Sequence, residues 1–432
     1  MNTAKHHCAS SVITASTSPD VAGGLRRGRR DAPVQKLLSG YAATVDALLQ
    51  AVDSSVAGDT LLLRSYVIER GESTEAVLHS LSRAAQRGVR VRLGMDRSPL
   101  SAFTRSCERS TTMEAEVMSL SRRFPEHVEL EGGERPDHSK LFLLHKGGEP
   151  SDSQLILGSL NLGGALCACV GEGYTADKGF SNQHLTRGLT PTPHTRSFRV
   201  ERFKTWRDFS LLVRGCNAVA TVEELMQGRC SLASVHDVDQ RVTFASNTPA
   251  EFCPLRFAAK LPLLRHNGVT QALEAFFSSP SARAFSVATA YIDKMGAQML
   301  LRALQTGKDV TLTVPRTPNV YAHANRAALA WLVKSAKSAP GRLRLLLHPA
   351  MLHAKAAVAL MDDSGVEAIL GSANLKARSL TQFGELTAQV SGGQAALQLR
   401  DALDALVDES REVTNRELLY DPMLSAVETY LG

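Results

Sequence analysis

The feature of this sequence that most constrains its fold is an internal duplication. Residues 59–93 predict a buried strand, an amphipathic helix that ends at Gly88, and a second strand. Residues 284–314 repeat this order, with Gly307 after the helix. The expected elements are strands at 59–68, 89–93, 284–292 and 310–314, and helices at 73–87 and 296–305. Only two copies occur, so the pattern predicts two similar α/β lobes rather than a solenoid.

Length and local composition suggest where the lobes begin and end. The chain has 432 residues, about three times a common domain length. Its first residues are rich in Ser, Thr and Arg and show no apolar periodicity, and residues 206–226 look helical and are expected to close the first lobe. The predicted domains are a flexible basic tail at 1–38, a first lobe at 39–230 with a surface loop at 175–198, a linker at 231–262 and a second lobe at 263–432.

Composition limits the classes of partner. The net charge of +6 suits an anionic substrate or surface without choosing between lipid headgroup and nucleic acid. No apolar run approaches the roughly 18 residues of a membrane-spanning helix. The seven cysteines form no C-x-x-C pair, which favours free thiols in a reducing compartment and no zinc site. We therefore expect a cytoplasmic protein with peripheral membrane contact as an option, and the Arg-rich start leaves organelle targeting open.

Each half also contains the same ordered set of chemically active residues. A His-x-Lys triplet is followed by Gly-Ser-x-Asn, and a glutamate lies 14 residues after each glycine. The first set is His138, Lys140, Gly158, Ser159, Asn161 and Glu172. The second set is His353, Lys355, Gly371, Ser372, Asn374 and Glu385. Either motif alone is uninformative, but two matching sets inside a duplicated fold pattern indicate a shared function.

The residue types favour chemistry on a phosphodiester. On a strand, His138 and Lys140 project to the same face, as do His353 and Lys355. Two such faces that meet about a pseudo-twofold axis would enclose one tetrahedral oxyanion, stabilised by lysines and asparagines, so that a single chain could form the complete site. One histidine would attack phosphorus and the other would protonate the leaving group, without metal or cofactor. Glu172 and Glu385 are the candidates to fix the histidine tautomers.

The paired motifs resemble those of the phospholipase D superfamily, whose signature is H-x-K-x(4)-D followed by G-S-x-N. Segments 84–96, 348–358 and 371–380 are similar to cardiolipin synthase-like members. The resemblance implies two α/β lobes, each a mixed sheet flanked by helices, with one shared active site and a phosphohistidine intermediate. It also implies that the amino-terminal histidine, His138, is the nucleophile and His353 the general acid, with Ser159 and Ser372 as substrate-binding residues.

The chain departs from this signature at the motif aspartate. His145 and Leu360 stand where Asp is expected, and Asp362 comes two residues late. This resembles the variant branch without that Asp, which includes tyrosyl-DNA phosphodiesterases. His145 is more simply a surface residue at a strand end.

Three functions remain open from the sequence. The favoured one is a phospholipid phosphodiesterase or phosphatidyltransferase. The alternative is a metal-independent nuclease or DNA-repair phosphodiesterase, which the basic charge permits although aromatic residues make up only 5%. A non-enzymatic relative is the third, and the complete pair of motifs argues against it.

Overall fold

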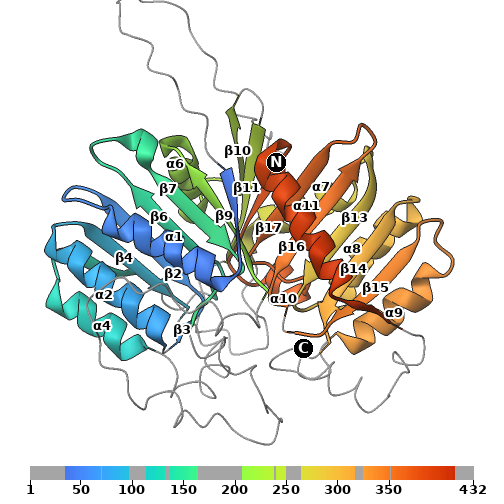
Figure 1. Ribbon diagram of the computed structural model, residues 1–432, viewed down its shortest axis with the longest axis horizontal. Coiled ribbons are helices and arrows are strands. Elements are labelled where there is room, and N and C mark those ends of the chain that lie inside the picture. Colours follow the sequence, from blue (N-terminus) through green and yellow to red (C-terminus); the bar gives the residue numbers. More distant parts are fainter. Residues whose placement is uncertain are drawn as a thin grey trace, which may run out of the picture. The chain divides into compact units, whose positions relative to one another are not determined.

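The computed structural model describes residues 35–69, 71–96, 113–131, 136–163, 207–237, 240–249, 264–316, 325–350 and 352–413. Two large β-sheets, one from each half of the sequence, form the centre of this part of the chain (Figure 1). The predicted loop at 175–198 and residues 1–34 of the predicted tail lie outside the described residues. No helix among the described residues is both long and apolar enough to cross a bilayer.

The first sheet has seven strands in the order β1-β9-β7-β6-β2-β4-β5. Their bounds are β1 Gln35–Ser39, β9 Phe209–Arg214, β7 Gln154–Gly158, β6 Leu141–His145, β2 Thr60–Ser65, β4 Arg90–Met95 and β5 Val128–Glu131. Strands β2, β4 and β5 are parallel, and the other pairs are antiparallel. A two-stranded ladder, β3 (Ile68–Glu69) with β8 (Leu162–Gly163), lies beyond the end of β2.

The second sheet has ten strands and repeats this arrangement. Its path is β10 (Leu232–Asp237), β11 (Gln240–Pro249), β18 (Glu385–Ser391), β17 (Val366–Gly371), β16 (Lys355–Met361), β13 (Ala282–Thr289), β14 (Asp309–Pro315), β15 (Leu343–His348) and β19 (Arg411–Glu412). Strand β12 (Leu264–Asn267) pairs with β11 off this path. The parallel strands β13, β14 and β15 correspond to β2, β4 and β5 of the first sheet.

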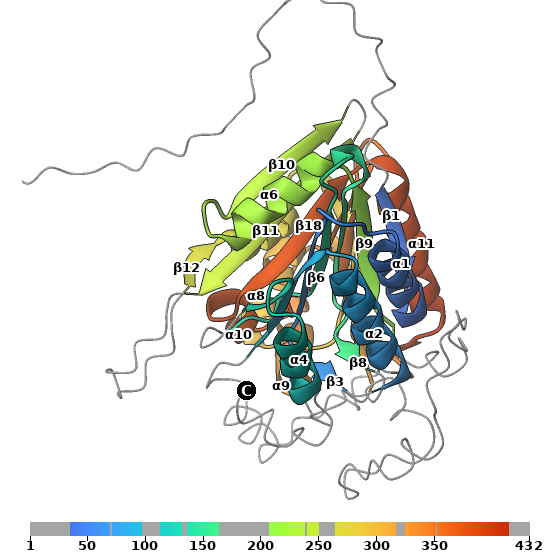
Figure 2. The ribbon, with the colours of Figure 1, turned by 90° about the vertical axis from the view of Figure 1, so that its left-hand side faces the viewer.

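Helices cover the outer face of each sheet. The helices α1 (Tyr41–Asp53), α2 (Glu72–Gln86) and α4 (Glu114–Arg123) pack on the first sheet, and α7 (Gly268–Phe277), α8 (Lys294–Gln305) and α9 (Arg326–Ala336) pack on the second (Figures 1 and 2). Because both faces of the central strands are covered, most of their side chains are buried, and Arg64 is the charged exception in β2. The segment 59–68 therefore has an apolar run at residues 61–63 in place of a regular alternation of polar residues.

A third core cluster joins the two lobes. It contains inward-facing residues of both sheets, Leu143, Leu155, Leu211, Val358, Leu370 and Ala388 among them. The helices α6 (Cys216–Met226) and α11 (Gly393–Asp408) contribute their apolar faces to the same cluster. The remaining short helices are the 3-10 turn Pro150–Asp152 and α10 (Ala377–Thr381). The predicted two-lobed α/β fold is thereby confirmed, with a shared apolar core between the sheets.

The structure corrects three local predictions. Residues 209–214 of the segment expected to be helical form the strand β9, because a short apolar run does not distinguish strand from helix. Within the predicted linker 231–262, β10 and β11 are strands of the second sheet, and small polar residues mask their alternation. Residues 35–38 of the predicted tail belong to β1, which pairs with β9. The predicted helices and strands of both repeats are present within a few residues of their expected bounds.

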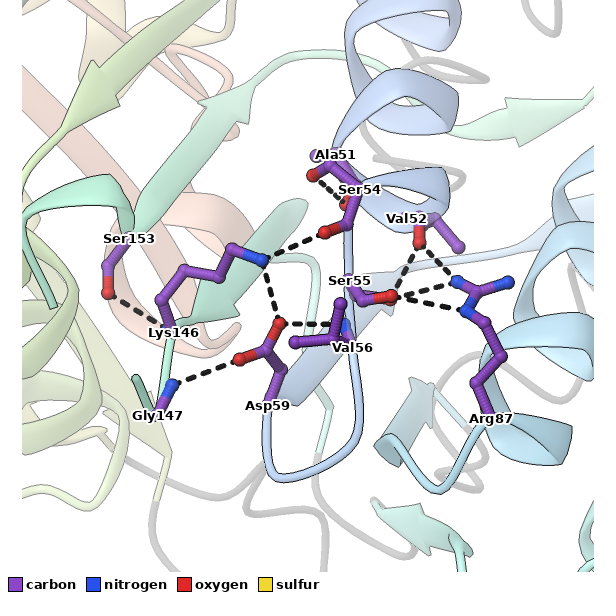
Figure 3. Close-up of polar contacts among 10 residues, drawn as sticks. All are labelled: Ala51, Val52, Ser54, Ser55, Val56, Asp59, Arg87, Lys146, Gly147 and Ser153. Carbon is purple, nitrogen blue, oxygen red and sulfur yellow. Dashed lines mark hydrogen bonds and ion pairs between the residues drawn. The ribbon is translucent and has the colours of Figure 1, made fainter. Parts of the chain in front are cut away.

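An ion pair between Asp59 and Lys146 stabilises the end of the first sheet at which β6 finishes, opposite the end that carries Lys140. Asp59 accepts hydrogen bonds from Lys146 Nζ at 2.9 Å, from Val56 N at 2.9 Å and from Gly147 N at 3.0 Å (Figure 3). Lys146 Nζ also donates to Ser54 O at 2.8 Å. These bonds tie the loop before β2 to the turn after β6. Burial alone would raise the pKa of Asp59, but Lys146 and the two backbone N–H groups hold it below its ordinary value.

Replacing this aspartate should weaken the fold in a pH-dependent way. Asp59→Ala is expected to lower the free energy of unfolding at pH 7 by about 1–3 kcal/mol, because two N–H groups and an ammonium lose their acceptor. Since the folded-state pKa is depressed, the stabilisation is present above the unfolded pKa of about 3.9 and is lost as the pH falls through the folded value. Urea unfolding at pH 7 and pH 3 measures the difference, and an equal loss at both would contradict the charge argument.

Candidate active site

The first histidine of the paired motifs is oriented by a carboxylate of the other lobe. His138 Nδ1 lies 3.0 and 3.2 Å from the two carboxylate oxygens of Glu385. The backbone keeps the two segments together, because His138 N donates to Gly384 O and Gly384 N donates to Pro136 O, each at 2.7 Å. Glu385 is buried at the start of β18. With Nδ1 bound to the carboxylate, Nε2 is the ring nitrogen available for reaction.

The second histidine mirrors this arrangement with the lobes exchanged. His353 Nδ1 lies 3.0 Å from Asp208 Oδ1 in the first lobe. Arg207 O accepts hydrogen bonds from His353 N at 3.0 Å and from Ala354 N at 2.9 Å. Each histidine is therefore held by the carboxylate of the opposite lobe, so that neither lobe alone completes its own His–carboxylate pair.

The lysine of each His-x-Lys triplet is buried beside its histidine. Lys140 Nζ donates to His138 O at 2.5 Å, and Lys355 Nζ donates to His353 O at 2.7 Å. The predicted placement on strands holds only in part, because β6 begins at Leu141 while Lys355 is the first residue of β16. Both triplets lie just before or at the start of equivalent strands, directly after the backbone hydrogen bonds that join the two lobes.

The glycine of each Gly-Ser-x-Asn motif permits close approach of a neighbouring strand. A Cβ atom at Gly158 would overlap Phe209 O, and one at Gly371 would overlap Leu386 O. This approach places the following serine against the carboxylate. Ser159 Oγ donates to Asp208 Oδ1 at 2.5 Å, and Ser372 Oγ donates to Glu385 Oε2.

These serines differ from the sequence expectation. Ser159 and Ser372 were predicted to bind substrate, but their side chains are buried and donate to the carboxylates that hold the histidines. They therefore lie behind the imidazoles and orient the carboxylates. The asparagines are different: the side-chain oxygens of Asn161 and Asn374 are buried and accept no hydrogen bond from the part of the chain that the structure describes. An amide oxygen accepts a hydrogen bond, so these open positions suit a donor group of a ligand, while the amide nitrogens are the donors that a phosphoryl oxygen needs.

One predicted carboxylate is replaced by another. Glu172 lies outside the described residues, and the first-lobe carboxylate that the structure places on a histidine is Asp208. Asp208 stands immediately before β9, as Glu385 stands at the start of β18. The interval of 14 residues between glycine and glutamate, which is the same in both halves, pointed to Glu172. In the first lobe, however, a longer segment separates Asn161 from β9, so the carboxylate that corresponds to Glu385 comes later in the sequence, at Asp208. A search for an acidic residue before the strand that precedes α6 would have found Asp208.

Two aromatic side chains that the motifs did not indicate flank His138. The Tyr66 ring meets the imidazole edge-on with centroids 4.8 Å apart, and Phe383 lies at 6.0 Å. The Tyr66 ring also lies 5.5 Å from Lys140 Nζ, within the range of a cation–π interaction. In strand register Tyr66 corresponds to Ala290 of the second lobe, because Ser65 Oγ and Thr289 Oγ1 each donate to the carbonyl two residues later. Tyr66 and Phe383 thus form an aromatic wall beside His138.

The carboxylates of the site are ionised and the histidines neutral in the free protein. Burial alone would raise the pKa of Glu385, but the adjoining His138 and Lys140 lower it below its ordinary value. Burial would also raise the pKa of Asp208, and His353 lowers it in the same way. Burial lowers the pKa of His138 despite the opposing charge of Glu385. Burial and the Lys355 charge lower the pKa of His353 to about 4.

The two lysines form a cationic centre whose charge is sensitive to pH. Burial lowers the pKa of Lys140 to about 8, against the opposing charge of Glu385. Burial and the Lys140 charge lower the pKa of Lys355 to about 7. The two ammonium groups thus repel each other across the lobes, and an anion bound between them would relieve this repulsion. The described residues contain no group of three His, Cys, Asp or Glu side chains that could hold a metal ion.

Anion affinity should therefore fall as the pH rises. Sulfate binding is expected to weaken from about pH 7 upward, by about tenfold per pH unit for each proton that binding must take up. Sulfate keeps its charge over this range, so the change reports the protein. Isothermal titration calorimetry from pH 6 to 9 measures it, and Lys355→Met should lack the step near pH 7. A constant affinity in the wild type would show that these lysines do not meet the anion.

Comparison with known proteins gives the class of this fold. No known family profile matches the sequence, and no curated protein sequence matches it. Among solved structures, the chain is similar to phosphatidylserine synthase of Haemophilus influenzae Rd KW20, with 13% identity, 93% of this chain and 94% of that chain covered, and a TM-score of 0.59. This likeness concerns the fold, and it agrees with the two α/β lobes that the paired motifs predict.

A second solved structure extends the likeness. Polyphosphate kinase of Porphyromonas gingivalis matches with 15% identity and a TM-score of 0.50, over 92% of this chain and 52% of that chain. This chain thus corresponds to about half of the kinase. Both likenesses concern the fold alone.

Proposed function

We propose that this protein is a phosphodiesterase or phosphatidyltransferase that acts on phospholipids through a phosphohistidine intermediate. The single observation that supports this most is the crossed arrangement of His138 with Glu385 and His353 with Asp208 around two buried lysines. It supplies two oriented imidazoles and two cations for one phosphoryl group, all from one chain. A cardiolipin synthase-like activity is the specific form that we propose, on the strength of the sequence resemblance.

In the first step, Nε2 of His138 attacks phosphorus and the P–O bond to the leaving group breaks. His353 donates a proton from Nε2 to the departing alkoxide. The low pKa of His353, about 4 in the free protein, means that substrate binding has to supply the protonated form. The negative phosphodiester favours this, because a nearby anion raises the pKa of a histidine.

In the second step, an acceptor hydroxyl group or water attacks the phosphohistidine. His353, now neutral, takes the proton of that hydroxyl, and the P–N bond to His138 breaks. Lys140, Lys355 and the side-chain amides of Asn161 and Asn374 would stabilise the charge on the phosphoryl oxygens in both steps. Glu385 and Asp208 keep each imidazole in the tautomer that has Nδ1–H. Water as acceptor gives hydrolysis, and an alcohol gives transfer.

Lipid specificity gains support from the structural similarity to a phosphatidylserine synthase, whose name assigns it phospholipid headgroup chemistry. The test uses vesicles of phosphatidylglycerol, vesicles of phosphatidylcholine, plasmid DNA and single-stranded oligonucleotides, each with chelator present. We expect turnover of lipid with the DNA intact. Cleavage of DNA with unchanged lipid would instead identify the nuclease alternative, and loss of the activity in His353→Asn excludes a contaminating enzyme.

A further inference from the structure

Asp137, the residue before His138, is bonded on both of its carboxylate oxygens. Asp137 Oδ1 accepts a hydrogen bond from Ser139 N at 2.9 Å, and Oδ2 accepts one from Arg64 Nη1 at 3.2 Å. Asp137 also forms a β-bridge with Gly384, the residue before Glu385. Arg64 thus holds the short segment that contains both the histidine and the lysine of the first lobe.

Arg64 is itself fixed on the sheet. Its Nε and Nη2 atoms donate to Glu131 Oε2 at 3.1 and 2.8 Å, and Arg92 pairs with the other oxygen of Glu131. The side chain lies flat across β4, because a Cβ atom at Gly94 would come within 2.8 Å of Arg64 Cγ. The Arg64 side chain is 21% exposed and that of Glu131 9% exposed, so solvent screens this network only in part.

The equivalent row of the second sheet carries no charged side chain. Cross-strand pairing places Leu141, Arg64, Gly94 and Glu131 in one row of the first sheet, and Ala356, Ala288, Thr313 and Leu346 in the equivalent row of the second. Leu352, which bridges Arg207, takes the place of Asp137. Ala288, Leu346 and Leu352 are almost fully buried. One histidine segment is therefore held through the side chain of Asp137, and the other through the backbone of Arg207, whose own side chain pairs with Glu409.

The charged network also acts on Lys140. Burial lowers the pKa of Lys140 to about 8, and Asp137 is one of the carboxylates that oppose this fall. The pKa of Lys355, whose equivalent neighbour is Leu352, falls to about 7. The charged groups that act on Lys140 or lie around it are Glu385, Asp137, Asp208, Asp96, Lys355, His138 and His353.

We propose that Arg64 and Asp137 are positioning residues that fix the segment of His138 and Lys140 and hold a negative charge beside the Lys140 ammonium group. This inference rests on the proposed function of the site. It implies that the two halves of the symmetric motif pair are unequal: the residue before the histidine supplies a carboxylate on the Lys140 side and an apolar side chain, Leu352, on the Lys355 side.

Two variants separate the effect of the position of the His138 segment from the effect of the Asp137 charge. Asp137→Asn keeps an acceptor for Ser139 N and removes the charge, so kcat should fall about three- to tenfold at pH 8 and less than about twofold at pH 6. The alkaline limb of its pH profile should move to lower pH. Arg64→Met keeps the Asp137 charge but releases the segment, so kcat should fall about tenfold across the pH range with KM little changed. Arg64→Lys should restore part of this loss.

Lys146→Met is the matched control. Lys146 follows β6 at the end opposite Lys140 and pairs with Asp59 (Figure 3), so its loss should lower Tm and leave the pH profile unchanged. If Asp137→Asn, like Lys146→Met, lowers Tm and leaves the pH profile of kcat unchanged, the positioning proposal is overturned. If the wild type turns over no phosphodiester, the proposed function fails. The pH dependence of sulfate binding is then compared between the wild type and Asp137→Asn. Superimposable curves for wild type and Asp137→Asn would then overturn the proposal independently.

Discussion

His138→Ala and His353→Ala are each expected to lower phosphodiester turnover by at least about 10²–10⁴-fold, the range typical for loss of one general acid–base group. Neither histidine can replace the other, because each is fixed by its own carboxylate, Glu385 or Asp208, on opposite lobes. The double variant should be little worse than either single one, since the two groups act in one reaction sequence. Steady-state rates of the purified variants measure this.

Trapping separates the roles of the two histidines. In His353→Asn the general acid and base is missing, so a substrate with a good leaving group should phosphorylate His138 and stop there. Peptide mapping by mass spectrometry at alkaline pH locates the phosphate. Phosphate on His353 in the converse variant, His138→Asn, would reverse the assignment, and no protein-bound phosphate in either would remove the covalent mechanism. His145→Ala, which changes an exposed histidine at the far end of β6, serves as control.

Glu385→Gln and Asp208→Asn are expected to have an effect of similar size, a loss of about 10³–10⁴ in kcat. In serine proteases, the equivalent Asp→Asn change costs about 10⁴ because the imidazole takes the wrong tautomer. Here the amide would face His Nδ1 and the serine hydroxyl that now donates to the carboxylate, Ser372 or Ser159. KM should change little, because neither carboxylate meets the substrate.

The crossed pairing makes a further distinction possible. Because Glu385 belongs to the second lobe, Glu385→Gln should disable His138 in the first, and a second change of His138 to Ala should then add little. Asp59→Asn, a change of a buried carboxylate distant from the histidines, is the control that should leave kcat intact. Additive losses from Glu385→Gln and His138→Ala would contradict the pairing.

The sequence predicted the repeated elements because they obey local rules. The amphipathic helix 73–87 and the glycine that ends it specify α2 without tertiary information, and the apolar strands follow from burial on both faces. The segment 240–249 was missed because β11 gains its stability from pairing with β18, which is distant in sequence. Strand β1 was missed for the same reason, through its pairing with β9.

The candidate site was predictable where the motif order is the same in both halves. The motif order predicted that each histidine lies beside its own lysine and that Glu385 holds a histidine ring, but it did not predict Asp208 as the second carboxylate. Asp208 escaped notice because the first lobe separates it from Asn161 by a longer segment than the second lobe has. The exchange of carboxylates between lobes, and the Arg64–Asp137 network, depend on three-dimensional packing that residue spacing does not encode.

The central claim is that Lys140 and Lys355, from different lobes, bind one phosphoryl group together. A crystal structure of the protein soaked with tungstate tests this most directly. We expect one anion per chain between the two imidazoles, with both lysine Nζ atoms in contact with it. Two separate anions, each bound by a single lobe, would contradict the account.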